Sequence, residues 1–195
     1  MGNGGHVIDR IERRLVEHPR RGLIVLGLFV LMLAVGALAL PSIGEMADRG
    51  VGIVEYELAR TTAEAERLNA LLGDEGRDAL RTSLWLDYPF LIAYGAFGAA
   101  CSLVFAARAT ERGRTALGRA GRTVAVAPLL AALCDAIENV ALFRVGAGHT
   151  DPPWPALAFG FASTKFALLA VAVLYGLVAA VATLPAVNRR PGWPT

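Results

Sequence analysis

Four long apolar stretches constrain this chain more than any other feature of its sequence. They cover residues 22–40, 83–107, 123–145 and 156–184. A helix needs about 20 residues to cross ~30 Å of hydrocarbon, and each stretch has that length. Because a backbone within lipid must satisfy its own hydrogen bonds, such stretches form helices. The sequence therefore predicts an all-α fold, a transmembrane four-helix bundle that forms one membrane domain over residues 22–184.

The composition agrees with a membrane protein and excludes several classes of function. Hydrophobic residues make up 55% of the chain, and its mean hydropathy is +0.49. No basic, aromatic surface for nucleic acid is evident, so no nucleic-acid partner is expected. The three histidines lie outside the spans, which argues against a haem or zinc site in the bundle. We therefore expect no metal and no cofactor. Richness in alanine and arginine, with a single lysine, indicates a bacterial coding bias.

Arginine distribution predicts the orientation of the chain. The connector 108–122 holds five arginines against one acidic residue, so the positive-inside rule makes it cytoplasmic. Both termini are then cytoplasmic in a bacterial cytoplasmic membrane: residues 1–21 as an amphipathic segment at the membrane surface, and residues 185–195 as a tail. A cleaved signal sequence is the alternative for the first span, because residues 37–39 resemble a small-residue cleavage site.

The first span is expected to end at Pro41, and a polar connector follows it. Residues 41–82 are net acidic and amphipathic, which suits the non-cytoplasmic side. Their apolar spacing predicts a helix over residues 53–72. This helix either covers the bundle as a lid or lies along the lipid surface, and a solvated connector is the alternative.

Polar side chains inside three spans are the candidate functional residues. They are Asp87 and Tyr94 in the second span, Asp135, Glu138 and Asn139 in the third, and Lys165 in the fourth. The spacings i, i+3, i+4 and i, i+7 place the residues of each span on one helix face. At about 1.5 Å per residue, all of them fall in the outer half of the membrane. The sequence therefore predicts one buried polar cluster, open to the non-cytoplasmic side or to the outer leaflet.

The cost of buried charge limits what this cluster can be. Each isolated charge near mid-bilayer costs at least ~2.5–3.5 kcal/mol, so Lys165 should pair with Asp135 or Glu138. A remaining carboxyl is then protonated or binds a cationic or polar ligand. If the protein is an enzyme, Asp135 or Glu138 donates or accepts the proton, and Lys165 adjusts the acidity of that carboxyl. We add Ser163 and Thr164, which flank the lysine, and Tyr175 to the candidate ligand-binding residues.

Three functions remain open at this stage. The first is binding of a lipid or small amphipathic molecule, with an amine as one ligand type, and with acid/base chemistry on an isoprenoid-like lipid as an extension. The second is an accessory or structural subunit that assembles with a partner membrane protein or as a homo-oligomer. The third is a small proton-coupled transporter. A buried polar network that only holds helices in register is the structural alternative.

Two motifs also carry a resemblance to known proteins. The stretch SLWLDYPFLIAY at residues 83–94, the stretch CDAIENVAL at residues 134–142 and a lysine in the last span are similar to a group of small four-span bacterial integral membrane proteins of unassigned function. The resemblance covers about residues 53–175 and implies an architecture without an activity. In layout alone, the chain resembles the emopamil-binding and sigma-2 receptor group, whose bundles hold acidic residues in a membrane pocket for sterol-like or amine ligands.

Overall fold

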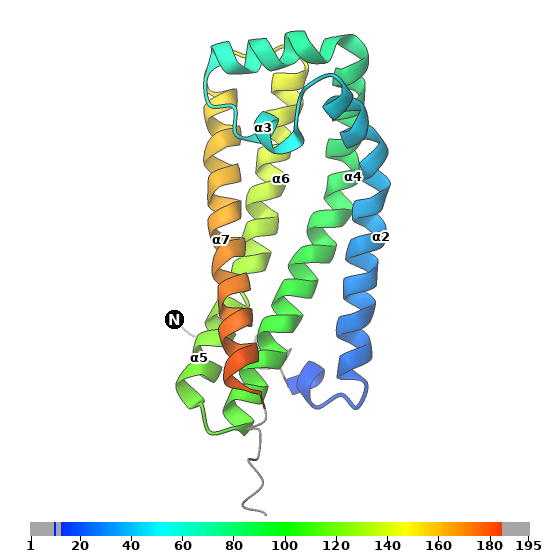
Figure 1. Ribbon diagram of the computed structural model, residues 1–195. Coiled ribbons are helices and arrows are strands. Elements are labelled where there is room, and N and C mark those ends of the chain that lie inside the picture. Colours follow the sequence, from blue (N-terminus) through cyan, green and yellow to red (C-terminus); the bar gives the residue numbers. More distant parts are fainter. Residues whose placement is uncertain (1–9, 11–12, 185–195) are drawn as a thin grey trace, which may run out of the picture.

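A computed structural model describes residue 10 and residues 13–184 of the chain (Figure 1). The expectation for the N-terminal segment falls partly outside these residues, and the expectation for the tail falls wholly outside them. The long helices of the described part are α2 (Arg21–Asp48), α4 (Thr62–Glu111), α6 (Ala127–Gly146) and α7 (Trp154–Ala182). Two short helices, α3 (Ile53–Glu57) and α5 (Thr115–Val124), lie at opposite ends of the bundle.

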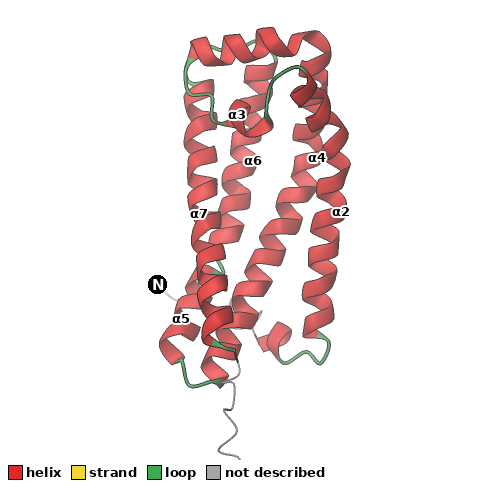
Figure 2. Cartoon of the chain, viewed as in Figure 1, coloured by secondary structure: helices red, strands yellow, loops and turns green. Residues whose placement is uncertain are grey.

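The described residues form helices joined by loops and turns, without a strand (Figure 2). Four helical segments are long and apolar enough to cross a membrane, when α5 and α6 are taken together as one segment. This confirms the prediction of an all-α four-helix bundle and indicates a multi-pass membrane protein.

Two helix ends differ from the predicted ends of the spans. The helix of the first span does not stop at Pro41, because α2 continues through this proline to Asp48. Pro41 has no amide hydrogen, so the carbonyl of Ala37 loses its donor in the helix, and membrane helices tolerate the loss of one such bond. Residue 123, where the third span was predicted to begin, lies near the end of α5. A separate helix, α6, begins at Ala127 with a proline in its first turn, where proline is favoured.

Helix α4 bends sharply at Gly73. This residue has φ 63° and ψ −167°, a conformation that is essentially restricted to glycine. Arg49 holds both sides of the bend, since its Nη1 donates to the carbonyl of Leu72 at 3.2 Å and its Nη2 lies 2.5 Å from Oε2 of Glu75. The residues of α4 before the bend lie across one end of the bundle (Figure 1), and those after it run down through the bundle.

We call residues 53–72, which contain α3 and the first part of α4, the lid. The sequence predicted one helix here, whereas the structure has two, because the chain leaves the helical conformation before Thr61, which begins α4 with a capping box. Asn69 fastens the lid, accepting a hydrogen bond from the hydroxyl of Tyr56 at 2.8 Å and donating one to the carbonyl of Val145 at 2.7 Å. Leu68 is also buried against this end of the bundle. These contacts favour the lid over the solvated connector.

Packing between the long helices determines where space remains. Helix α4 packs against α2 and α6, and α6 packs against α7. The contact of α4 with α6 is close at Gly98, where an added Cβ would lie 2.8 Å from the ring of Pro128. Helix α2, by contrast, packs mainly against α4. Consequently α2 and α7 flank α4 and α6 on opposite sides of the bundle (Figure 1).

Candidate functional site

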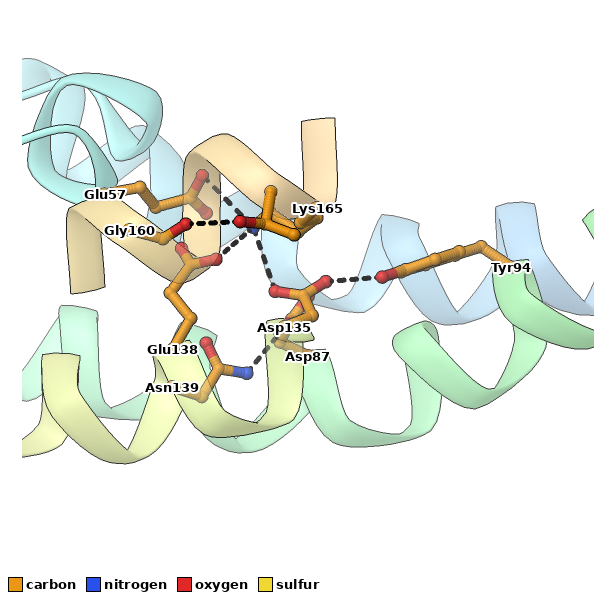
Figure 3. A network of polar contacts seen from close by, with 9 residues as sticks. Glu57, Asp87, Tyr94, Asp135, Glu138, Asn139, Gly160 and Lys165 are labelled. Atoms are coloured by element: carbon orange, nitrogen blue, oxygen red, sulfur yellow. Dashed lines mark hydrogen bonds and ion pairs between the residues drawn. The ribbon is translucent and has the colours of Figure 1, made fainter. Parts of the chain in front are cut away.

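Five ionisable side chains from four helices meet beneath the lid (Figure 3). We call them the acidic cluster: Glu57 from α3, Asp87 from α4, Asp135 and Glu138 from α6, and Lys165 from α7. Each of these helices therefore contributes at least one carboxyl or ammonium group to the same place in the fold.

Lys165 is the centre of the acidic cluster. Its Nζ lies 2.9 Å from Oδ1 of Asp135, 2.9 Å from Oε2 of Glu138 and 3.4 Å from Oε2 of Glu57. The ring of Phe166 lies 4.9 Å from the same nitrogen, which adds a cation–π contact. Lys165 is buried, so its charge depends on these partners rather than on water. The sequence left open whether Asp135 or Glu138 pairs with the lysine, and the structure shows both.

Two hydrogen bonds extend the acidic cluster toward α4. The hydroxyl of Tyr94 donates to Oδ2 of Asp135 at 2.9 Å, and the side-chain amide of Asn139 donates to Oδ2 of Asp87 at 2.7 Å. Asp135 thus holds a lysine with one oxygen and a tyrosine with the other. Asp87 is held by a neutral amide and makes no ion pair within the described residues.

Acidic groups outnumber basic groups in this cluster. Four carboxyls surround one ammonium group, and no arginine of the described residues makes an ion pair with them. Glu138 is fully buried, and neither of its oxygens has a hydrogen bond of good geometry among the described residues. A buried, ionised carboxyl without a basic partner destabilises the folded protein. Each carboxyl that Lys165 does not neutralise therefore requires a proton or another cation.

A cavity of about 520 Å³ adjoins the acidic cluster. At its lid end lie the polar side chains of Glu57, Asp87, Tyr94, Asp135 and Lys165. Elsewhere its walls are mainly apolar and include Met32, Phe90, Phe97, Phe105, Phe166 and Leu169. One continuous space therefore joins a charged end to an apolar length, which is the usual composition of a ligand pocket with a few polar groups that orient the ligand.

The structure brings six of the nine candidate residues together. They are Asp87, Tyr94, Asp135, Glu138, Asn139 and Lys165. The other three lie apart from them. Ser163 and Thr164 are exposed on the outer face of α7, and the hydroxyl of Thr164 donates to the carbonyl of Gly160. Tyr175 lies near α5, where its hydroxyl donates to the carbonyl of Leu117 at 3.3 Å.

Glu57 is the member of the acidic cluster that sequence reasoning missed. It lies in the polar connector, where it was one acidic residue among nine. Only the lid brings it over Lys165, so no spacing within a span identifies it. The available signal was charge balance, because a buried lysine needs acidic partners and the connector that covers Lys165 contains carboxyls. Arg144, the arginine of α6, stacks on the ring of Trp154, with 5.2 Å to the ring centre.

The pH dependence of stability should carry a contribution from Glu57. Burial raises the pKa of this carboxyl from 4.5 to about 6, although Lys165 opposes the shift. A carboxyl with a raised pKa binds its proton more tightly in the folded protein, so it stabilises the fold below pH 4.5. This contribution, about 2 kcal/mol, is lost as the pH rises through about 6.

Replacing Glu57 by glutamine should remove this contribution. We expect the wild type to lose thermal stability relative to Glu57→Gln as the pH rises from 4 to 8. Glu55→Gln, on the same helix but in an exposed pair with Arg67, is the control and should leave the pH profile unchanged. A constant difference between the wild type and Glu57→Gln would contradict the prediction.

The fold and the site define an all-α membrane protein with a charged cluster and a cavity inside its bundle. A scan against protein-family models, a search of curated proteins and a search of solved structures found no match to the chain.

Proposed function

We propose that this protein binds a lipid or small amphipathic molecule in the cavity, with the polar head of the ligand at the acidic cluster and its apolar part along the bundle. The observation that carries the proposal is the continuous space that joins Asp87, Asp135 and Lys165 to a wall of phenylalanines. The charged end of this space suits the polar head of an amphiphile, and the apolar wall suits its hydrocarbon part.

The arrangement of helices supports entry from the bilayer. Helix α2 contributes Met32 to the cavity and α7 contributes five residues beyond Lys165, yet these two helices pack mainly on α4 and α6 rather than on each other. We therefore place the entry of an amphiphile dissolved in the membrane on the side of the cavity that α2 and α7 line.

The charge of the cluster favours a head group that donates hydrogen bonds or carries a positive charge. Lys165 already has three carboxylates within 3.4 Å, so an anionic head would compete with all of them. Asp87 faces the cavity without a cationic partner among the described residues. A protonated amine placed between Asp87 and Asp135 would supply the missing charge.

Changing the charge of Asp87 tests the proposal. Asparagine keeps the shape of this side chain and an acceptor for Asn139, but it loses the negative charge. A charge-assisted hydrogen bond contributes about 1.5–3 kcal/mol, so we expect Asp87→Asn to reduce ligand occupancy by at least about tenfold. Native mass spectrometry of the protein released from lipid nanodiscs measures the occupancy.

The control is Asp78→Asn, a change of the same kind on the exposed face of the same helix. It should leave the occupancy unchanged. Both variants should unfold at nearly the wild-type temperature, which separates loss of the ligand from loss of the fold. Equal occupancy in the wild type and in Asp87→Asn would overturn the proposed role of the cluster.

Acid/base chemistry on a bound isoprenoid-like lipid is a second candidate function. It is favoured by the hydrogen bond between Tyr94 and Asp135, because both side chains line the cavity and share one proton position. In D2O, an enzyme of this kind would exchange carbon-bound hydrogen of a co-purified lipid for deuterium. Tyr94→Phe and Asp135→Asn should then abolish the exchange while the lipid remains bound.

The remaining alternatives predict other results. An accessory subunit would be unstable when purified without its partner membrane protein, and a homo-oligomer would show more than one copy per nanodisc. A proton-coupled transporter would move its substrate only under a proton gradient. Membership in the small four-span bacterial group, with both termini cytoplasmic and the lid outside, is part of the proposal, and cysteine labelling of the lid from each side of the membrane tests the orientation.

A further inference from the structure

A second pocket lies between the ends of α4 and α7, at the end of the bundle opposite the lid (Figure 1). We call it the basic pocket. Its lining includes Phe105, Arg108, Glu111 and Arg112 from α4 and its C-cap, and Ala180 and Leu184 from α7 and the residues after it. None of the five residues of the acidic cluster lines it. The basic pocket therefore joins charged and apolar side chains at a place in the fold that has no role so far.

Arg108 and Arg112 carry positive charge that no described carboxylate balances. Both are exposed and stand four positions apart, which places them on one face at the end of the helix. Neither makes an ion pair within the described residues. The carboxylate of the pocket, Glu111, lies 3.9 Å from Arg21, so an arginine of another helix matches its charge. Residues 185–195, which follow in the sequence, contain two arginines and no acidic side chain.

The helix ends account for only part of this charge. Helix α4 ends at Glu111 and α7 ends at Ala182, and the carboxyl end of a helix carries about half a negative elementary charge. An arginine beside such an end stabilises the helix, which is the structural role of arginine here. Two full positive charges exceed the partial charges of both ends. The basic pocket therefore keeps a net positive charge that an anion would neutralise.

The basic pocket also lies at the level of lipid head groups. Arg108 comes directly after the apolar stretch 83–107, and Leu184 is the last residue of the apolar stretch 156–184. Lipid phosphates lie just outside the hydrocarbon, where side chains at the ends of such stretches can reach them. Phe105 and Ala180 line the pocket on the hydrocarbon side of the arginines. An anion that carries a hydrocarbon chain therefore suits this pocket better than a small ion.

We infer that the basic pocket binds the phosphate of an anionic phospholipid, with Arg108 and Arg112 on the phosphate oxygens and an acyl chain along Phe105 and Ala180. Guanidinium groups bind phosphate through paired, charge-assisted hydrogen bonds. The unbalanced arginines favour a head group with a net negative charge, such as phosphatidylglycerol. Phosphatidylcholine is disfavoured, because its own ammonium group neutralises its phosphate. This site does not depend on the function proposed for the acidic cluster.

Nanodiscs with equal mole fractions of phosphatidylglycerol and phosphatidylcholine test the inference. Native mass spectrometry measures the ratio of the two lipids that stay bound to the protein. A basic residue near anionic lipid contributes about fivefold in affinity, so Arg108→Gln should lower this ratio about fivefold and Arg108→Gln/Arg112→Gln about 25-fold. The control is Arg119→Gln, an exposed arginine of α5 outside the pocket. It should change the ratio less than about twofold, because salt screens its charge from the pocket.

Two further arms separate the pocket from its charge and the lipid from a free anion. Ala180→Phe fills the apolar wall and leaves every arginine in place, so it should lower phosphatidylglycerol occupancy as much as Arg108→Gln does. Inorganic phosphate has the anion without the chain, so adding it to the nanodiscs should not displace the lipid. Thermal unfolding should be the same in the wild type and in the arginine variants, since these side chains are exposed.

Three results would overturn the inference. Equal losses in Arg108→Gln and Arg119→Gln would mean that the arginines attract anionic lipid diffusely, without a site. Wild-type occupancy in Ala180→Phe would exclude the pocket as the place of binding. Displacement of phosphatidylglycerol by inorganic phosphate would make a free anion the ligand. Asp87→Asn, which tests the acidic cluster, should leave the ratio of the two lipids at its wild-type value.

Discussion

Replacing Lys165 by methionine should destabilise the protein by about 3–5 kcal/mol, the cost of removing one partner from a buried ion pair. Methionine has a similar length but no charge, so it leaves Glu57, Asp135 and Glu138 facing one another without a cation. Asp135 and Glu138 are buried, so little water screens their charges. Thermal unfolding in a mild detergent measures the loss.

Two comparisons make this prediction specific. Arg81→Met removes an exposed cation of α4 and should change stability by less than about 0.5 kcal/mol. Combining Lys165→Met with Glu138→Gln removes a charge of each sign, so the double variant should be more stable than Lys165→Met alone. If Lys165→Met unfolds like the wild type, the lysine does not balance the cluster and the electrostatic argument fails.

Replacing Gly73 by valine should cost about 3 kcal/mol, because a β-branched residue strongly disfavours a positive φ. Gly73 has φ 63° and is the point at which α4 turns from the lid into the bundle. The variant must either strain this residue or straighten the helix. A straightened helix would carry the lid away from Val145 and Glu57 away from Lys165.

Two measurements distinguish strain at residue 73 from displacement of the lid, and a control variant shows whether any change from glycine to valine has the same effect. Thermal unfolding gives the loss of stability, and limited proteolysis of residues 49–62 reports the displacement of the lid. Gly27→Val is the control, since Gly27 lies within α2 and an added Cβ there has nothing within 4 Å. It should unfold like the wild type. A lid equally resistant to protease in Gly73→Val and in the wild type would argue against the bend as its anchor.

The sequence predicted the four-helix architecture because hydrocarbon length and backbone hydrogen bonding leave few alternatives for apolar stretches of this size. The ends of the helices were harder to predict. Pro41 was read as an end, yet α2 continues beyond it, since one missing amide is tolerated when the rest of the helix stays paired. The predicted helix over residues 53–72 ends just before Gly73, but the role of this glycine as a bend depends on the contacts of Arg49, 24 residues earlier.

The candidate site was predictable only where it follows from helix periodicity. Asp135, Glu138 and Asn139 share a face by their spacing, and a buried lysine needs acidic partners. Glu57 was not identified because its position depends on how the lid folds over the bundle. Ser163, Thr164 and Tyr175 were included for their closeness in sequence to Lys165 or for their aromatic character. Ser163 and Thr164, two and one positions before the lysine on the helix, face outward and are exposed.

Helix α2 packs mainly on α4 and contributes no group to the acidic cluster. The ion pairs at its two ends join Arg21 to Glu111, and Arg49, its C-cap, to Glu45 and Glu75. An outward tilt of α2 would have to break its packing on α4, including the ring contact of Phe29 with Phe97 at 5.4 Å, but it would break no ionic contact of Lys165. Opening of the proposed binding cavity on the α2 side would therefore leave the charge balance of the acidic cluster unchanged.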